Sequence, residues 1–356
     1  MIFHQIPTGG CQSYLLGCAG TCAAVLIDPA LSQIDRYVGL LAREGLRLRY
    51  VVDTHTHADH FSAARQIKES LNVPAVMHRE SLAPYADLRL DDGDMLIAGD
   101  IRLQALHTPG HTNDSMCLIL DDRVFTGDTL LIGATGRTDL PTGDPEALYD
   151  SLFNRLLNLD PALEVFPAHD YKGRQSSTIG AEIADNPRLQ KRDRAEFVEM
   201  MRCLNLSAPD HMTAALRANM CGGKTVEQLL GEAAAKVPFM AMDELRDRLA
   251  RRDNDLVVLD VRERADFDTD HIAGARNVPR GQLELVVDRV LPDPTLRIVT
   301  VCEYGRISTL AAATLRELGF RRAAALEGGL KQWREADYPL ETGVAQPWRG
   351  DLSPEI

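Results

Sequence analysis

The chain has 356 residues, which is enough for two ordinary domains that each bury a sizeable core. Hydrophobic residues make up 45% and charged residues 26%, a balance typical of globular proteins that gives no support for a disordered or fibrous class. The net charge of -13 argues against broad nucleic-acid binding, because phosphates are recognised by basic patches.

The cysteines and the absence of long apolar runs predict a cellular setting. The seven cysteines are an odd number without a CxxC pair, which favours reduced thiols over a disulfide framework. The start, MIFHQIPTGG, has neither the features of a secretory signal nor those of a transit peptide. No run approaches the roughly 18 apolar residues of a membrane span. We therefore expect a cytoplasmic protein that does not bind a membrane. The sequence does not decide whether the protein is a homo-oligomer.

The first part of the chain predicts a mixed α and β structure. Short apolar runs with β-branched residues predict strands at Ala23–Ile27, Tyr50–Asp53, Ala75–Met77, Ile101–Leu106, Met116–Leu120 and Arg123–Thr126. Helical patterns lie between them, at Ile34–Glu44 and Phe61–Leu71, and a charged helical region covers Ala181–Gly223.

After Gly223 the pattern changes to alternating strands and helices, which is typical of a parallel sheet covered by helices on both faces. Strands are predicted at Leu256–Val261 and Arg297–Val301, and helices at Met242–Ala250 and Thr309–Leu318. We therefore predict a first domain over 1–223, a linker over 224–236, a second domain over 237–347 and a tail over 348–356.

A cluster of metal-binding residue types follows the apolar run that ends at Asp53. The sequence THTHADH places His55, His57, Asp59 and His60 within six residues, and the alternating His55 and His57 can point to one side. Imidazole and carboxylate are ligands for zinc, iron or manganese.

Three single ligands follow, each just beyond an apolar run: His111 in LHTPGHTND, Asp128 in FTGDTLL and His169 in FPAHDY. In this order the motifs closely resemble the metallo-β-lactamase fold, an α+β sandwich of αββα layers. The stretches AAVLIDP, GRTDL, FPAHDYKG, NPRL and ANMCG are similar to the persulfide dioxygenases, over essentially residues 1–223.

The resemblance implies oxidation of glutathione persulfide by O2 to sulfite and glutathione at one Fe(II) per chain. It implies that His55, His111 and Asp128 hold the iron, and that Arg137 and Tyr171 bind the substrate. His57, Asp59, His60 and His169 are given orienting roles or a second metal site. Such a second site is typical of the related glyoxalase II thioesterases.

The second half carries a different signature. LDVRERADFDTDHIAGARNVP, then VCEYGRIS, then EGGLKQW resemble a single α/β rhodanese domain. Cys302 ends an apolar run before a tight turn and a helix, where backbone N–H groups and the helix end can stabilise a thiolate. We expect Cys302 to be the sulfur-transfer nucleophile, and Asp260, Arg262, His271 and Trp333 to brace the fold.

One position departs from the rhodanese pattern. Rhodaneses commonly carry Arg five residues after the cysteine, whereas Arg306 is four residues after Cys302. Glu303 beside the nucleophile also opposes an anionic donor, so Arg306 is only a candidate for substrate binding and the sulfur donor stays open.

The two halves together are similar to a persulfide dioxygenase–rhodanese fusion acting in hydrogen sulfide metabolism. The expected partners are glutathione persulfide, glutathione, O2, thiosulfate and sulfite. The first alternative is a binuclear zinc thioester hydrolase fused to a sulfurtransferase. The second is a sulfur-relay protein whose first domain is not catalytic.

Overall fold

The computed structural model describes residues 1–170, 172–204, 206–207, 209, 212–253, 255–291 and 293–343. These residues form two compact units, Met1–Gly223 and a second that begins at Lys224. Among the described residues, no helix is long and apolar enough to cross a membrane.

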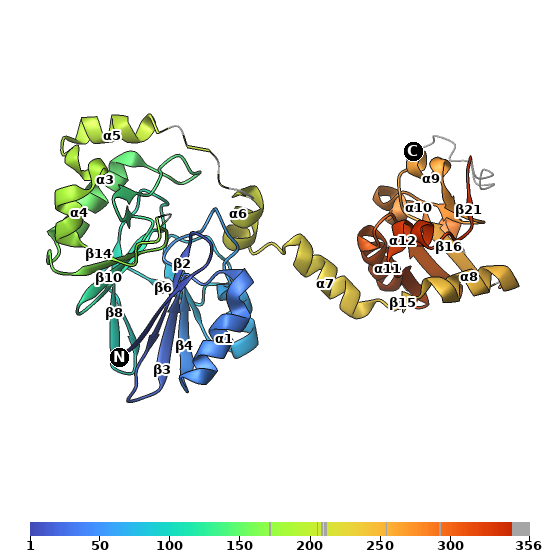
Figure 1. Ribbon diagram of the computed structural model, residues 1–356, viewed down its shortest axis with the longest axis horizontal. Coiled ribbons are helices and arrows are strands. Elements are labelled where there is room, and N and C mark those ends of the chain that lie inside the picture. The colour runs from blue at the N-terminus through green and yellow to red at the C-terminus, as the bar shows by residue number, and fades with distance from the viewer. Residues whose placement is uncertain are drawn as a thin grey trace. The chain divides into compact units, whose positions relative to one another are not determined.

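The first unit contains two six-stranded sheets (Figure 1). In spatial order the first consists of β1 (Ile2–Pro7), β2 (Gln12–Gly17), β3 (Ala23–Ile27), β4 (Arg47–Val52), β5 (Ala75–His78) and β6 (Leu88–Leu90). The second consists of β14 (Ser177–Thr178), β13 (Glu164–Pro167), β10 (Arg123–Gly127), β9 (Met116–Leu120), β8 (Ile101–His107) and β7 (Met95–Ala98). A small hairpin joins β11 (Leu130–Leu131) to β12 (Ala134–Thr135).

The main core lies between the two sheets. Buried side chains of both sheets form one cluster there, which includes Tyr14, Val25, Leu103, Phe125 and Phe166. The opposite face of the first sheet is covered by α1 (Ile34–Arg43) and α2 (Ala64–Leu71). The outer face of the second is covered by α3 (Pro145–Phe153), α4 (Ile179–Asp185) and α5 (Arg194–Arg202). The predicted αββα sandwich is confirmed, and α6 (Met212–Cys221) completes the unit.

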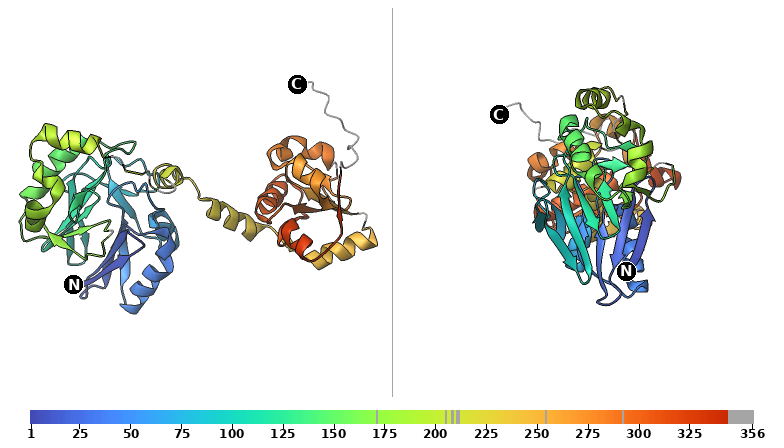
Figure 2. Two further views of the ribbon diagram at one scale, coloured as in Figure 1. Left: turned by 45° about the horizontal axis from the view of Figure 1, so that its top comes forward. Right: turned by 90° about the vertical axis from the view of Figure 1, so that its left-hand side faces the viewer.

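The second unit has a five-stranded sheet whose neighbouring strands are all parallel. Its order is β15 (Phe239–Met240), β20 (Ala323–Leu326), β19 (Arg297–Val301), β16 (Leu256–Asp260) and β18 (Arg276–Asn277). A short antiparallel pair joins β17 (His271–Ile272) to β21 (Leu340–Glu341). The helices are α7 (Val226–Lys236), α8 (Met242–Arg251), α9 (Arg264–Thr269), α10 (Leu283–Val290), α11 (Arg306–Glu317) and α12 (Gly329–Glu335). The left-hand view of Figure 2 shows helices around the sheet of this unit.

Alternation along the strands of this sheet divides the core into two layers. Val257 and Leu259 of β16 join the cluster on one face, whereas Val258 joins the cluster on the other face together with Trp333. Successive side chains of a strand point to opposite faces, so a strand buried on both sides is apolar throughout. The predicted parallel α/β domain is confirmed.

The segment 224–236, which we expected to be a linker, forms helix α7. Thr225 caps this helix by accepting a hydrogen bond from the backbone N–H of Gln228, and Gln228 bonds back to the N–H of Thr225. This capping box satisfies backbone donors that would otherwise be unpaired. Ala233 is buried, so the helix has an inward face within the second unit.

Candidate functional site

Three of the expected metal ligands meet at the ends of strands. His55 follows β4, His111 follows β8, and Asp128 follows β10. Oδ2 of Asp128 lies 3.4 Å from Nε2 of His111 and 3.9 Å from Nε2 of His55. The three ligand atoms lie within 4.8 Å of one another, and all three residues are buried. The structure therefore brings together the triad that the resemblance implied.

His55 is held by a chain of polar groups that ends on Asp28. Nδ1 of His55 lies 2.9 Å from Oγ1 of Thr54, and this hydroxyl donates to Oδ2 of Asp28 at 2.9 Å. Because the Thr54 hydroxyl donates its proton to the hydrogen bond with Asp28, its oxygen accepts from Nδ1–H of His55. The lone pair of the ring is then on Nε2, the nitrogen that faces Asp128.

Nε2 of His55 is buried and has no hydrogen-bond partner among the described residues. Burial, and next the charge of His57, lower the pKa of His55 well below its usual value, so the imidazole is neutral. A neutral, buried and unpaired nitrogen is the form in which histidine binds a metal. The triad thus fits a metal ion bound by two histidines and one carboxylate.

The Asp128 carboxylate divides its two oxygens between two groups of residues. Oδ2 faces His55 and His111, while Oδ1 accepts a hydrogen bond of 2.6 Å from Nδ1 of His169. Burial alone would raise the pKa of Asp128, but the charges of the neighbouring histidines, His169 first, outweigh it and hold the pKa far below its usual value. Asp128 is therefore an anion at neutral pH, as a metal ligand must be.

A second group of potential ligands lies beside the triad, and it includes a residue that the sequence analysis missed. The group consists of Cys11, Asp59, His60 and His169. Sγ of Cys11 lies 3.2 Å from Nε2 of His169 and 3.3 Å from Oδ2 of Asp59. Burial opposes protonation of His60, but the hydrogen bond with Asp59 prevails and raises its pKa to about 10.

His57 faces a different way from the second group. Its Nε2 lies 3.2 Å from Oδ1 of Asp28, and it forms a third buried group with Asp28 and Asp53. Burial raises the pKa of Asp53 to about 6. Nε2 of His57 thus has the contact of an orienting residue, while its Nδ1 is buried without a hydrogen-bond partner among the described residues. The orienting role or second metal site expected for His57 stays a prediction.

Asn219 of α6 fixes the backbone of the same loop. Its side-chain amide donates to the carbonyl oxygens of His57 at 2.9 Å and of His60 at 2.8 Å, and its oxygen accepts from the N–H of Ser62. This asparagine belongs to the ANMCG motif, which was noted only as a family feature. A buried side chain that satisfies three backbone groups explains why that motif accompanies the metal cluster.

A cavity of about 810 Å³ lies against both ligand groups. Its lining includes Cys11, His111, Asp128, Arg137 and His169. The Arg137 guanidinium bonds to the Asp139 carboxylate and to the carbonyl oxygens of Ser207 and Leu206. Arg137 thus braces its loop while lining the cavity. Tyr171, the other predicted substrate-binding residue, lies outside the described residues.

The second unit has its own site, at the end of β19. Cys302 is 2% exposed, and its Sγ accepts a hydrogen bond of 3.2 Å from the backbone N–H of Ser308. Helix α11 begins at Arg306, somewhat earlier than predicted. Gly329 of the EGG turn approaches closely, because a Cβ there would lie 2.6 Å from the carbonyl oxygen of Cys302.

The residues expected to brace this unit are buried and bonded. The Asp260 carboxylate accepts hydrogen bonds from the Arg262 side chain, and the Trp333 indole N–H donates to the carbonyl oxygen of Pro339. His271 bonds to the carbonyl oxygen of Phe267. Arg306 is different, because its side chain is 60% exposed and lies 3.7 Å from Glu227 of α7.

Two family profiles match this chain, one in each unit. The metallo-beta-lactamase superfamily profile matches residues 6–169, and the rhodanese-like domain profile matches residues 241–336. A metallo-beta-lactamase from Staphylococcus aureus has the same fold over 92% of this chain and 98% of its own, with a TM-score of 0.58 and 23% identity.

Closer relatives match the first unit. Human mitochondrial persulfide dioxygenase ETHE1 is 41% identical over 223 residues, which cover 62% of this chain and 87% of the human protein. The mouse protein of the same name is 39% identical over the same lengths. The crystal structure of ETHE1 from Myxococcus xanthus is 42% identical with a TM-score of 0.61, and the match covers 63% of this chain and all of that one. Through its first unit the chain belongs to the persulfide dioxygenase family of the metallo-β-lactamase superfamily, and a rhodanese-like domain follows in the second unit.

Proposed function

We propose that the first unit oxidises glutathione persulfide with O2 to sulfite and glutathione, at one Fe(II) held by His55, His111 and Asp128. The unpaired Nε2 of buried His55 beside His111 and Asp128 carries this proposal, together with the family. Two histidines and one carboxylate leave positions open on the metal, which is the ligand set of non-haem Fe(II) oxygenases. When bound, Fe(II) supplies the site for O2 and for the persulfide sulfur.

The chain's own residues position that metal and the substrate. Thr54 and Asp28 fix the orientation of His55, and His169 holds Asp128 through its other oxygen. Such outer contacts are worth about 10–100-fold in metal affinity or activity. We propose that Arg137 and Tyr171 bind the glutathione part. A guanidinium pairs with a carboxylate through parallel hydrogen bonds.

We propose that the second unit transfers sulfane sulfur through Cys302. The Cys302 thiolate attacks the outer sulfur of a donor, a Cys302 S–S bond forms, and the donor leaves with the electron pair of the broken bond. Glutathione or sulfite then takes the sulfur, so thiosulfate, glutathione and sulfite are the proposed partners. Since all seven cysteines are free, we place this chemistry in the reducing cytoplasm.

Dioxygen uptake by the Fe(II)-loaded full chain, with glutathione persulfide added, tests this assignment. We expect rapid uptake with sulfite as product. His111→Ala should lower the rate by at least about 100-fold, because metal ligation is lost. Cys302→Ala should leave uptake unchanged, because it alters only the second unit. No uptake at full iron occupancy would contradict the proposal.

Two other outcomes would favour the alternatives. The donor group of Cys11, Asp59, His60 and His169 lies beside the triad and favours a binuclear thioester hydrolase as the second candidate. Two bound zinc ions and thioester hydrolysis without O2 would support that enzyme. Loss of all turnover in Cys302→Ala with none lost in His111→Ala would instead indicate a sulfur relay with a non-catalytic first domain.

A further inference from the structure

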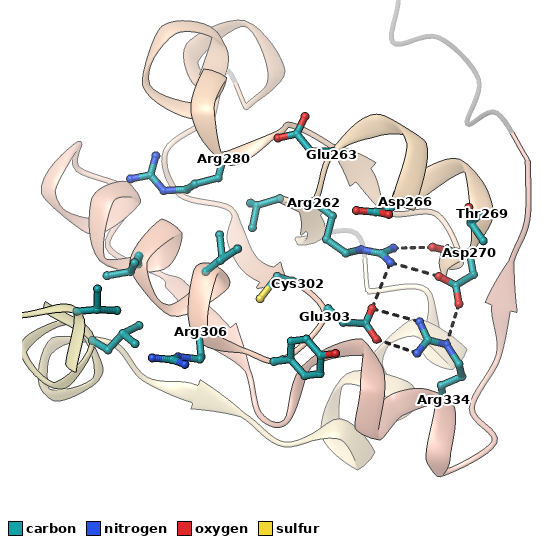
Figure 3. Close-up of a pocket in the computed structure, with 16 residues that line it drawn as sticks. Arg262, Glu263, Asp266, Thr269, Asp270, Arg280, Cys302, Glu303, Arg306 and Arg334 are labelled. Carbon is teal, nitrogen blue, oxygen red and sulfur yellow. Dashed lines mark hydrogen bonds and ion pairs between the residues drawn. The ribbon is translucent and has the colours of Figure 1, made fainter. Parts of the chain in front are cut away.

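The pocket above Cys302 has two unlike walls, and it is large for an inorganic donor. Its volume is about 950 Å³. On one side of the cysteine Figure 3 shows a charged network of Arg262, Asp270, Glu303 and Arg334. The other wall is apolar, and part of it comes from α7, outside the segment that matches the rhodanese profile.

The charged wall offers no surplus of positive charge. Arg334 lies 2.9 Å from Glu303 and 2.8 Å from Asp270, and these carboxylates raise its pKa. Arg262 lies 2.7 Å from Asp260 and also faces Asp270 and Glu303. Both guanidiniums are therefore neutralised by the carboxylates around them.

The remaining two arginines of the pocket are paired as well. Arg280 lies 2.8 Å from Glu284, and Arg306 lies 3.7 Å from Glu227. The pocket lining as a whole contains four arginines and four acidic residues. A small dianion such as thiosulfate would have to displace a carboxylate from every cation that it met, and desolvating it without a free cation is unfavourable.

The apolar wall suits the carbon body of an organic molecule. It consists of Val226 and Leu230 of α7 with Ile307 and Leu310 of α11. Val226 and Ile307 are 51% and 49% exposed, so a bound molecule would remove apolar surface from water. Because Cys302 is 2% exposed below these side chains, a donor must reach past them to its sulfur.

We propose that the donor of this pocket is a small organic persulfide, preferred over thiosulfate, and that Val226 and Leu230 of α7 determine this preference. The proposal rests on sulfur transfer at Cys302, as proposed above. The outer sulfur of the organic persulfide bonds to Cys302, and the bond to its inner sulfur breaks. The organic thiolate departs with that electron pair, so no oxidant or reductant is needed.

Steady-state sulfur transfer to sulfite by the full chain, with glutathione persulfide or thiosulfate as donor, tests the proposal. We expect the wild type to have the higher kcat/KM for glutathione persulfide. Leu230→Ala should raise KM for that donor about 10-fold, because lost apolar contacts of this size are worth about 10–200-fold. Its kcat, and its kcat/KM for thiosulfate, should stay within about 2-fold of wild type.

Leu229→Ala is the matched control. Leu229 precedes Leu230 on the same helix but is 44% exposed and does not line the pocket, so both donors should react as in the wild type. A wild-type preference for thiosulfate, or an equal loss of both donors in Leu230→Ala with an unchanged Leu229→Ala, would overturn the proposal.

A measurement without substitution covers the case in which Leu230→Ala does not fold. The unreactive thioether S-methylglutathione should slow alkylation of Cys302 by iodoacetamide, whereas the same concentration of sulfate should not. Equal protection by sulfate would overturn the proposal. A failure of the proposed function can be told apart from a failure of the donor preference. If Cys302 is not the nucleophile, Cys302→Ser would still transfer sulfur from both donors.

Discussion

The hydroxyl of Thr54 should control how tightly the first unit binds its metal. Thr54 is 1% exposed, and its Oγ1 lies 2.9 Å from both Nδ1 of His55 and Oδ2 of Asp28. Thr54→Val keeps the shape but removes the link, so Nδ1 of His55 and Oδ2 of Asp28 each lose a partner. An unsatisfied buried polar group costs about 1–3 kcal/mol.

The expected effect on affinity follows from that cost. A loss of about 1.4 kcal/mol is a factor of ten in affinity, so Thr54→Val should bind Fe(II) about 10–100-fold more weakly. The assay is anaerobic titration of Fe(II) against a competing chelator. Thr54→Ser retains the hydroxyl and should stay within about 3-fold of wild type.

A second control separates metal affinity from stability. Thr300 is buried in the second unit, where its hydroxyl bonds to the carbonyl oxygens of Ser308 and Ala324. Thr300→Val should destabilise its own unit while Fe(II) binding stays unchanged. If Thr54→Val bound Fe(II) as tightly as Thr54→Ser, the hydrogen-bonded chain from Asp28 to His55 would not orient the ligand, and the argument would be refuted.

Three further predictions concern the second unit. Trp333→Ala should destabilise it by about 3–5 kcal/mol in denaturant unfolding, because the side chain is 1% exposed. Gly329→Ala should abolish sulfur transfer without affecting O2 uptake, because φ is +66° there and a Cβ would strike the backbone of Cys302. Burial opposes ionisation of Asp270, but hydrogen bonds from Arg334 and Arg262 prevail and lower its pKa. Asp270→Asn should therefore be less stable than wild type at neutral pH, and the difference should shrink as the pH falls from about 4 through the lowered pKa of Asp270; a difference independent of pH would contradict this.

The triad was expected from the resemblance to the persulfide dioxygenases, and the local pattern agrees with it. His55, His111 and Asp128 each follow an apolar strand, and strand ends at one edge of a sandwich deliver their next residues to a common place. The helix boundary was less predictable: we expected a helix from Phe61, but α2 begins at Ala64. Residues 59–60 instead turn so that both side chains meet Cys11.

Cys11 could not be predicted because its partners are remote in sequence. It pairs through its backbone with His169, 158 residues away, in an isolated β-bridge. Cys11 precedes β2 and His169 follows β13, and no sequence motif links two positions so far apart. The charged pocket network has the same origin, since Arg334 meets Glu303 only through the packing of α12 against the cysteine loop.

Helix α7 was missed for a different reason. The local signals were present: Thr225 and Gln228 have capping-box spacing, and Leu229, Leu230 and Ala233 repeat at helical intervals. We assigned the segment to a linker because it precedes the rhodanese motifs. The motif positions marked the catalytic part of the unit rather than its full extent.

The position of α7 has a consequence for dissecting the chain. A fragment beginning at residue 241, where the rhodanese profile begins, would retain the parallel sheet strands β16, β18, β19 and β20 together with the nucleophile. It would lose Val226 and Leu230, and with them one side of the opening above Cys302. Kinetic constants of such a fragment would describe an uncovered cysteine loop, whereas a fragment beginning at Lys224 would report the selectivity of the natural enzyme.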